Sequence, residues 1–355
     1  MKIIFNNTIF FSQKFGGISR YFVSLAEELL KKNIKLKIVA PINKNNLLKK
    51  IPTNSKFSFY FQRYPILKIF EKFNNYLSKM IIKNFKPDIF HETYYSNFNY
   101  DDIEAKKIIT VYDLIHEKFP EYFSNEKINE KKNIKNYDHY ICISKNTKKD
   151  LIEFYKIPEK KISVIYLSGS HYRNLKASNY SKNISRQNFF LYVGSRENYK
   201  NFNLIIECFK KYEYLQNFKI VCFGGGKFTN SEVENFAGLK VEHIEGNDQE
   251  LIDLYCNAIC LLLPSKYEGF GIPMLEAMEL SCPVLSSSTE ALREIGDDAA
   301  LYFDPESCHE LKKKIELIIH DSEIRSSLIK KGLKRANFFS WKKCSDQTFE
   351  VYNLL

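Results

Sequence analysis

The chain has little or none of several features that mark whole classes of protein. Among its 355 residues are one Trp and four Met, and its eight Cys form no C-x-x-C pair. Such pairs are typical of zinc and redox sites, so we expect reduced, buried thiols, as in the apolar runs around Cys142, Cys222 and Cys260. No apolar run approaches the roughly 18 residues that span a bilayer, and the apolar start at residues 1–6 is too short for a signal peptide. We therefore expect a cytoplasmic protein whose contact with a membrane is peripheral.

Familiar catalytic motifs are missing as well. The chain has no G-x-G-x-x-G, which counts against a nicotinamide dehydrogenase, and no G-x-S-x-G, which a Ser-His-Asp hydrolase would carry. The seven histidines show no metal-ligand spacing on a helix, and no Asp-x-Asp occurs. We therefore expect neither a metal nor a cofactor.

Acidic residues are in the minority. The 42 Asp and Glu stand against 53 Lys and Arg, which gives a formal net charge of +11. This balance suits nucleic acid, an anionic membrane or phosphorylated substrates. The excess is mostly Lys scattered along the chain, and we find no arginine-rich arm, helix-turn-helix or zinc-finger spacing. We expect a solvated, lysine-rich surface, with attraction to an anionic membrane face as the sharper alternative and no nucleic-acid partner.

Strand-like and helix-like segments alternate along the whole chain. This pattern predicts an α/β fold of two doubly wound, Rossmann-like domains with parallel sheets. The expected strands are Lys2–Phe5, Lys35–Ala40, Phe57–Phe61, Asp88–His91, Lys107–Val111, His139–Ser144 and Ile162–Ile165, and then Phe189–Val193, Phe218–Phe223, Lys240–Ile244, Ala258–Leu263 and Pro283–Ser286. We predict a first domain over residues 1–170, a linker over 171–187 and a second domain over 188–337. Two such domains would place a ligand between them, because ligands bind beyond the carboxyl ends of parallel strands.

The most informative segment is Pro264–Met278, which carries Glu268 and Glu276 on either side of a Gly-Phe-Gly sequence. We expect a strand, a tight glycine loop and a helix that begins at Ile272 or Pro273, since Pro suits the first helical turn. The amides of such a loop and the positive end of the helix would face an anionic ligand. A negative ligand with hydroxyls for carboxylates to bind describes a nucleotide sugar.

Three further glycine loops follow expected strands. Gly16-Gly17 comes after the first strand and a short polar stretch, Gly194-Ser195-Arg196 precedes Lys200, and Gly224-Gly225-Gly226 fails the P-loop pattern. Backbone amides at the first loop could approach a diphosphate, and the two cations could balance its charge. Plain turns and exposed cations explain the same residues about equally well.

Five candidate residues of the first half lie at the ends of expected strands or shortly after them. His91 closes one expected strand and is followed by Tyr94, while Tyr112-Asp113 and His116 follow the next. In a doubly wound fold such positions face a ligand cleft. A lone histidine is as often structural, and that alternative stays open here.

Taken together, these residues resemble glycosyltransferase family 4, the retaining sugar transferases of GT-B fold. The resemblance covers nearly the whole chain. It is carried by Tyr192–Arg196 with Lys200-Asn201, by Leu263–Gly271 with Glu276-Ala277, and by Glu294–Asp297 before Phe303–Pro305. Gly16–Phe22 and Thr110–Leu114, with Phe119–Glu121, are similar to the mannosyltransferase-B-type branch, which builds O-antigen or related surface polysaccharides.

The resemblance implies roles for the residues of the second domain. Arg196 and Lys200 would hold the donor diphosphate, Glu276 the ribose, and Glu268 the donor sugar. Further donor contacts are implied in the second domain for Ser195, Gly224, Gly225, Gly269, Phe270, Gly271 and Ile272, and in the first domain for Gly16 and Gly17. Metal ions are not required, because Arg and Lys take their place.

In the first domain the resemblance implies a His where this chain has Tyr112, beside Asp113. A backbone carbonyl at Tyr112 would still contact the sugar. His91 and His116 are candidate substitutes for the missing imidazole, and with Tyr94 they are candidate acceptor residues. The resemblance also implies that a closing helix at about 338–355 packs back on the first domain.

The expected activity is therefore transfer of a hexose, with mannose from GDP-mannose favoured, to a lipid-linked oligosaccharide at the inner face of the cell membrane. The product would be O-antigen, capsule or lipopolysaccharide. Two alternatives remain: a nucleotide-sugar epimerase of the same fold, and a non-catalytic adaptor at a membrane or nucleic acid. An epimerase would turn over its donor without an acceptor.

Overall fold

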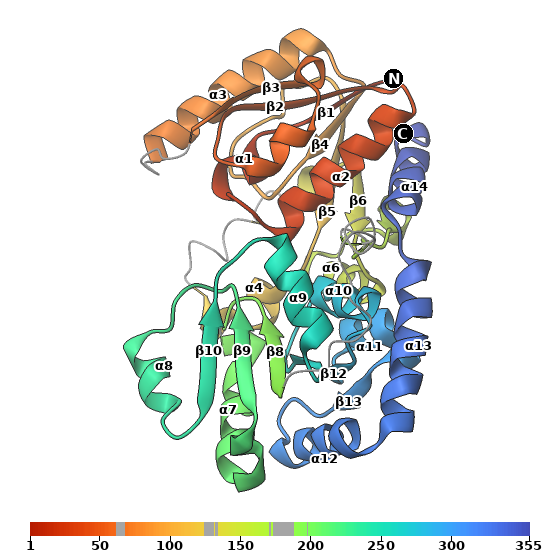
Figure 1. The fold of residues 1–355 in the computed structure, drawn as a ribbon. Coiled ribbons are helices and arrows are strands. Elements are labelled where there is room, and N and C mark those ends of the chain that lie inside the picture. Colours follow the sequence, from red (N-terminus) through yellow and green to blue (C-terminus); the bar gives the residue numbers. More distant parts are fainter. Residues whose placement is uncertain (62–67, 124–130, 132–133, 170–171, 173–187, 197) are drawn as a thin grey trace. The chain divides into compact units, whose positions relative to one another are not determined.

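The computed structural model describes residues 1–61, 68–123, 131, 134–169, 172, 188–196 and 198–355. It divides into two compact units, Met1–Leu167 with Trp341–Leu355, and Ser168–Ser340 (Figure 1). The predicted boundaries were 170 and 337, and nearly all of the predicted linker, 171–187, lies outside the described residues.

The first unit is built on a seven-stranded sheet in the order β3-β2-β1-β4-β5-β6-β7, and every pair of neighbours is parallel. Its strands are β1 Lys2–Phe5, β2 Lys35–Asn43, β3 Lys56–Tyr60, β4 Ile89–Glu92, β5 Lys106–Val111, β6 His139–Cys142 and β7 Ile162–Val164. Its helices are α1 Thr8–Ser12, α2 Gly17–Lys31, α3 Lys68–Phe85, α4 Ile115–Lys118, α6 Lys145–Tyr155 and α14 Trp341–Asn353.

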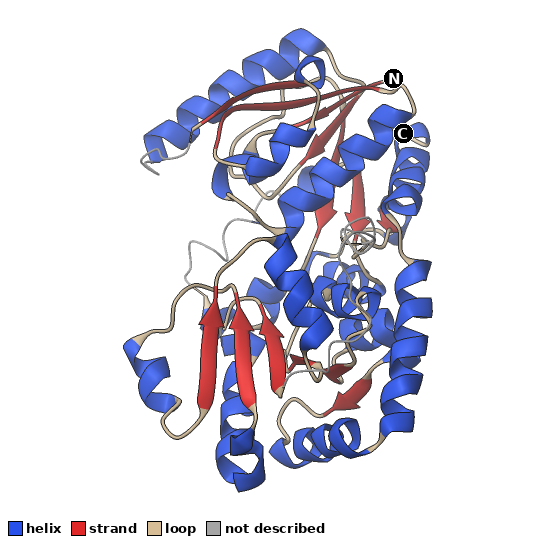
Figure 2. Ribbon diagram, viewed as in Figure 1, coloured by secondary structure: helices blue, strands red, loops and turns tan. Residues whose placement is uncertain are grey.

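The second unit has a six-stranded parallel sheet in the order β10-β9-β8-β11-β12-β13. Figure 2 colours strands red and helices blue. Its strands are β8 Phe189–Val193, β9 Lys219–Phe223, β10 Lys240–Ile244, β11 Leu261–Leu263, β12 Val284–Ser287 and β13 Leu301–Phe303. Its helices are α7 Phe202–Lys211, α8 Asn230–Asn235, α9 Asp248–Asn257, α10 Ile272–Glu279, α11 Glu290–Gly296, α12 Cys308–His320 and α13 Ser322–Phe338.

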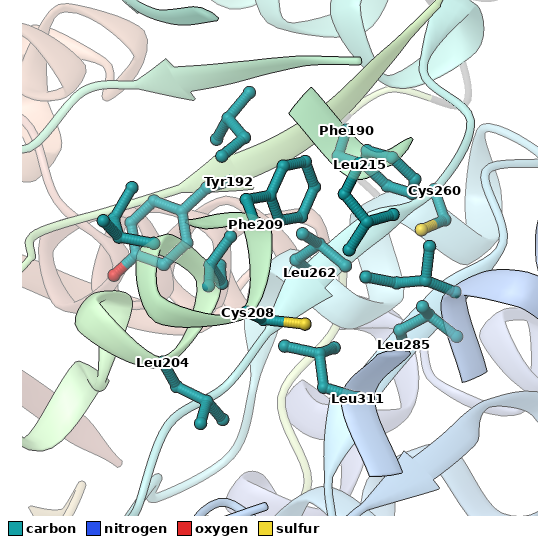
Figure 3. Close-up of a cluster of buried hydrophobic side chains, with 14 of the residues drawn as sticks. Phe190, Tyr192, Leu204, Cys208, Phe209, Leu215, Cys260, Leu262, Leu285 and Leu311 are labelled. Carbon is teal, nitrogen blue, oxygen red and sulfur yellow. The ribbon is translucent and has the colours of Figure 1, made fainter. Parts of the chain in front are cut away.

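The core of the second unit lies between one face of its sheet and helices α7 and α12. Figure 3 shows Phe190 and Leu262 of neighbouring strands packed with Phe209 of α7 and Leu311 of α12. All four side chains are buried. Strands buried in this way read as continuous apolar runs, which is why the sequence located them well.

Helix α14 belongs to the first unit and packs beside α2. The ring centroids of Trp341 and Tyr21 lie 6.1 Å apart, and the ammonium of Lys32 lies 2.6 Å from an Asp346 carboxylate oxygen. At the other end of α14, the Tyr352 hydroxyl is hydrogen bonded to Nδ1 of His91 at 2.6 Å. The last helix therefore completes the fold of the first unit with contacts along its length.

The α/β fold class and the parallel sheets are confirmed, and every predicted strand is present. Among the described residues, five helices and strands were missed: α1, α4, α8, α11 and β13. The stretch after β1 was expected to be polar and irregular, but α1 buries Ile9, Phe10 and Phe11. Strand β13 and helix α11 were also missed, because three-residue and seven-residue elements hold too few residues to show a period.

Candidate functional site

In the second unit, the candidate residues lie on loops that leave neighbouring parallel strands. Strand β8 lies between β9 and β11, so the chain turns back at this point in the strand order. The loops after β8 and β11 therefore diverge from adjacent strands, which is where open α/β sheets bind ligands. A backbone hydrogen bond of 2.8 Å from Lys266 N–H to the Tyr199 carbonyl ties the two loops together.

The structure brings Lys200 and Glu268 together. The Lys200 ammonium donates to both carboxylate oxygens of Glu268, at 2.8 and 3.0 Å. The Ser265 hydroxyl donates to the same carboxylate at 2.8 Å. A lysine in this position is a compact positive charge that is already oriented. The carboxylate that orients it can also accept hydrogen bonds from hydroxyl groups.

The turn from β11 into α10 is built as expected. Gly271 takes φ +100° before the helix begins at Ile272, and Pro273 occupies the first turn. The positive φ favours glycine at this position, and a Cβ there would also require the Leu292 side chain, whose methyl carbon would lie 2.6 Å away, to shift. The first turn of α10 holds no acidic side chain, which leaves the positive end of its dipole open to an anion.

Glu276 lies one turn into α10 and is buried. The buried Tyr255 hydroxyl of α9 donates to its carboxylate at 3.1 Å. Burial, and after it the charge of Glu276, raises the pKa of Tyr255 well above its ordinary value, so this hydroxyl stays a donor. The Glu276 carboxylate is thereby held in one orientation.

Arg196 is oriented toward the triple-glycine loop. Its Nε donates to Glu232 at 2.6 Å, and its Nη2 donates to the carbonyls of Gly226 and Lys227 at 3.0 and 3.2 Å. Burial is the largest single influence on Glu232 and opposes its ionisation, but the hydrogen bonds from Arg196 and Thr229 and the charge of Arg196 together lower its pKa. Arg196 therefore fixes the shape of the glycine loop, and its predicted contact with a diphosphate stays a prediction.

The glycine loop itself needs its glycines. Gly224, Gly225 and Gly226 all have φ between +73° and +77°. A Cβ on Gly225 would collide with the Gly194 carbonyl oxygen, because the loops after β8 and β9 pack backbone against backbone there. Ser195 lies beside this contact, and its carbonyl accepts a hydrogen bond from Tyr192.

Four partners at these loops were missed from the sequence: Asn201, Glu232, Tyr255 and Ser265. Asn201 has a left-handed backbone, and its amide donates to the carbonyls of Pro264 and Pro305 at 3.0 and 2.7 Å. Asn201 thereby ties the segment that carries Lys200 to the end of β11. The family-like motif contains Asn201 and Ser265, but only the fold shows what they contact.

In the first unit, Gly17 is the first residue of α2 and Gly16 precedes it in extended backbone. The first turn of α2 carries no acidic residue, and the Arg20 amide already donates to the Gly16 carbonyl at 3.0 Å. The predicted helix start is present. Its role toward a diphosphate stays a prediction.

Of the two roles left open for His91, acceptor contact and structural support, the geometry favours the structural one. Its ring is fully buried, with Nδ1 bonded to Tyr352 and Nε2 to the Thr110 hydroxyl at 2.9 Å. Burial lowers the pKa of His91 to about 3, so the imidazole is neutral. His91 joins the sheet to α14, and a satisfied, enclosed ring of this kind is structural.

The Tyr112 side chain also points inward, where its hydroxyl donates to the Thr93 carbonyl at 3.3 Å and its ring stacks on Tyr94 at 6.2 Å. Asp113 accepts the Ile115 amide at 3.2 Å and so shapes the start of α4. Its carbonyl accepts from the buried Lys131 ammonium at 2.9 Å.

His116 is buried within α4, with its ring centroid 4.4 Å from that of Phe123. His116 thus packs on Phe123, whereas His91 bonds to Tyr352 and Thr110. A role for His116 in place of the imidazole missing at Tyr112 stays a prediction.

Glu92, which sequence reasoning missed, is a buried acid of the first unit with a raised pKa. It is buried at the end of β4, accepts a hydrogen bond from Tyr137, and accepts another from Asn6 at 3.3 Å. It borders a cavity of about 80 Å³ together with Tyr100 and Lys107. Burial raises its pKa to about 8, against the opposing hydrogen bonds from Tyr137 and Asn6.

Two family models match this chain and together cover most of it. The model described as "Glycosyltransferase Family 4" matches residues 15–167, and "Glycosyl transferases group 1" matches residues 176–335. The first match lies within the first unit, and the second covers most of the second unit.

Individual proteins agree with the family models. "O-antigen chain mannosyltransferase B" of Escherichia coli is 39% identical over 108 residues, which is 30% of this chain and 28% of that protein. "O-antigen chain mannosyltransferase RfbU" of Salmonella typhimurium is 31% identical over 179 residues, 49% of each chain. The chain thus spans about half the length of these curated relatives, or less.

The solved structure of Anabaena Alr3699/HepE in complex with UDP-glucose has a TM-score of 0.75 at 14% identity, with both chains fully covered at 100%, and shows the shared fold.

The packing of Gly225 predicts a difference between two glycines of the same backbone conformation. Gly225→Ala and Gly226→Ala both place a side chain at positive φ, which costs roughly 1 kcal/mol. Only Gly225→Ala adds a collision with the Gly194 carbonyl, so we expect it to lower the free energy of unfolding by about 3 kcal/mol. Urea unfolding of both variants measures this, and equal losses would contradict the backbone contact.

The raised pKa of Glu92 predicts a pH dependence of stability. In the unfolded chain Glu92 ionises near its ordinary pKa of 4.5, whereas in the folded chain it stays protonated up to about 8. The free energy of unfolding should therefore fall by about 1.4 kcal/mol per pH unit across that interval, relative to Glu92→Gln. Urea unfolding from pH 5 to 9 tests this, and a constant difference between the two proteins would contradict it.

Proposed function

This chain belongs to glycosyltransferase family 4, and from that premise we propose that it transfers a hexose from a nucleotide diphosphate sugar to a surface oligosaccharide. The proposed donor is GDP-mannose. The proposed acceptor is a growing, lipid-linked chain of O-antigen, capsule or lipopolysaccharide. Support comes from relatives whose names are O-antigen chain mannosyltransferases and from a neighbour of the same fold solved with UDP-glucose.

The observation that carries the proposal is the Lys200–Glu268 pair, which joins the loop after β8 to the loop after β11. A diphosphate brings more than one negative charge and competes with Glu268 for the lysine ammonium. The open start of α10 adds a second positive field from backbone amides. When Lys200 turns toward the diphosphate, its hydrogen bonds to Glu268 weaken. The Glu268 carboxylate can then accept hydrogen bonds from hydroxyl groups of the donor sugar.

The reaction is a displacement at the anomeric carbon of the donor. The bond from that carbon to the diphosphate oxygen breaks, and a bond to the acceptor oxygen forms on the same face. The acceptor proton passes to the departing phosphate oxygen. We assign Lys200, with Arg196 behind the glycine loop, to the charge that develops on the diphosphate, and Glu276 to the ribose hydroxyls. No metal or cofactor is assigned a step.

We further propose that the protein works at the cytoplasmic face of the membrane as a peripheral protein. None of the helices in the described ranges is both long enough and apolar enough to cross a bilayer. The net charge of +11 favours attraction to anionic lipid headgroups.

Replacing Lys200 and replacing Glu276 should give different kinetic results. Lys200→Ala removes charge stabilisation needed mainly in the transition state, so kcat should fall by roughly 100-fold to 1000-fold. Glu276→Gln weakens a contact made equally in ground and transition states, so KM should rise with kcat little changed. Release of GDP from GDP-mannose in the presence of acceptor measures both.

A matched control exists within the same unit. Lys219 and Glu242 form an exposed ion pair at 2.7 Å on β9 and β10. Lys219→Ala and Glu242→Gln should leave both constants unchanged. Full activity of Lys200→Ala would refute the assignment, and donor turnover that needs no acceptor would favour an epimerase.

The donor base is tested by binding alone. If the donor is GDP-mannose, GDP at about 100 times its Kd should stabilise the folded protein by about 2.7 kcal/mol, while UDP at the same concentration gives less. Thermal unfolding across a panel of nucleoside diphosphates measures this. A larger shift with UDP would contradict the GDP assignment and leave the transferase activity in place.

A further inference from the structure

Helix α3 of the first unit has polar residues on its buried face. Asn74, Asn75 and Ser78 are all buried. Asn74 accepts the Ile42 amide at 2.9 Å and donates to the Ile42 carbonyl at 3.0 Å. Asn75 accepts from Asn7 at 2.6 Å. Side-chain hydrogen bonds therefore hold this part of the helix, whereas nearer its C-terminus Ile82 is buried in an apolar cluster against which Ile81 and Phe85 pack.

The outer face of the same helix is apolar. Ile69, Phe73, Tyr76 and Met80 are 73%, 59%, 60% and 48% exposed. Their spacing of four, three and four residues places them on one line along the helix, which we call the α3 stripe. Figure 1 shows α3 in orange, as a long helix along one side of the first unit. An exposed line of large apolar side chains marks a surface that binds a partner.

The charges beside the α3 stripe are positive. Lys72 lies three residues after Ile69, and Lys83 lies three residues after Met80, so both ammonium groups border the stripe on one side. The single acid of the helix, Glu71, precedes the inward-facing Asn74 by three residues and so lies on another side. Lys83 also contacts Asp102, which it shares with Lys79 at 2.5 Å, so two ammonium groups there face one carboxylate.

Two occupants could cover such a stripe: a lipid surface or a second copy of the chain. A helix of 18 residues is about 27 Å long and about 10 Å wide. It offers roughly 270 Å², far less than the roughly 800 Å² per partner of a stable protein interface. A second copy would also bring the same lysines against each other. Partial insertion into a lipid headgroup region needs only a narrow apolar line with a cationic border.

We propose that the α3 stripe docks the protein on a membrane of anionic lipids, with Phe73 and Tyr76 inserted and Lys72 and Lys83 at the headgroups. Aromatic side chains and lysines are the residues that settle at this depth of a bilayer. Exposed Phe59 and Phe61 at the edge strand β3 supply further apolar area in the same unit. The proposal rests on the proposed function in one respect, which is that a lipid-linked acceptor is reached from the membrane surface.

The test uses the full chain and two kinds of vesicle. One kind is phosphatidylcholine alone, and the other is phosphatidylcholine mixed with an equal part of phosphatidylglycerol. We expect the wild-type chain to sediment with the anionic vesicles, and the double variant Phe73→Ser with Tyr76→Ser to bind them roughly tenfold more weakly. Lys72→Glu should weaken binding a few-fold, in a salt-dependent way. Val233→Ser, which changes an exposed apolar residue of the second unit, is the matched control and should bind like the wild type.

Failure of docking is distinguishable from failure of the proposed function. Release of GDP from GDP-mannose with a water-soluble acceptor should be equal in the wild type and the stripe variant. Normal turnover without vesicle binding, or equal binding by the stripe variant, would overturn the docking proposal alone. Absence of turnover in every chain would refute the proposed function and leave the vesicle result standing. A wild-type dimer that the stripe variant converts to a monomer, measured by light scattering, would assign the stripe to a second copy and overturn the lipid proposal.

Discussion

The candidate site depends on one ion pair that crosses the point where the strand order of the second sheet turns back. Lys200 follows β8 and Glu268 follows β11, and these strands are neighbours although they are far apart in the chain. Parallel strands send their following loops to one edge, and at a reversal those loops separate and leave their polar groups toward solvent. The Lys200–Glu268 pair holds these loops in register, and Asn201 and Ser265 support it from either side.

The strand order of the first sheet also turns back, but neutral groups meet at that point. Its order turns back between β1 and β4, where the Thr93 amide donates to Asn6 at 2.8 Å. The two reversals thus differ in charge. A neutral hydrogen bond closes the one in the first unit, whereas an ammonium and a carboxylate meet at the one in the second. The second carries an ammonium that can turn from its internal carboxylate to an anionic ligand, and the released Glu268 carboxylate can then bind hydroxyl donors of that ligand.

Much of this could be predicted from the sequence, and the reasons are local. Buried parallel strands are short apolar runs, and the β11–α10 turn carries Gly271 and Pro273 at positions where few other residues fit. The partners could not be predicted in the same way. Glu232 lies 36 residues from Arg196, and Tyr352 lies 261 residues from His91. The position of His91 at a strand end indicated a ligand site, but the sequence does not show that the C-terminal helix covers that position.

The buried Asn74 on the inner face of α3 matches a local irregularity in the first sheet. Strand β2 shifts register between Ala40 and Ile42, around Pro41, which has no amide hydrogen to donate. The amide and carbonyl of Ile42 take Asn74 as partner there. Burying backbone groups without partners is costly, so the inner face of α3 must carry polar side chains at this height. Nearer its C-terminus the inner face of α3 carries the buried Ile82, so one face combines polar and apolar contacts. The bulge in β2 thus accounts for Asn74, and the exposed apolar residues on the opposite face form the surface that we propose docks on a lipid membrane.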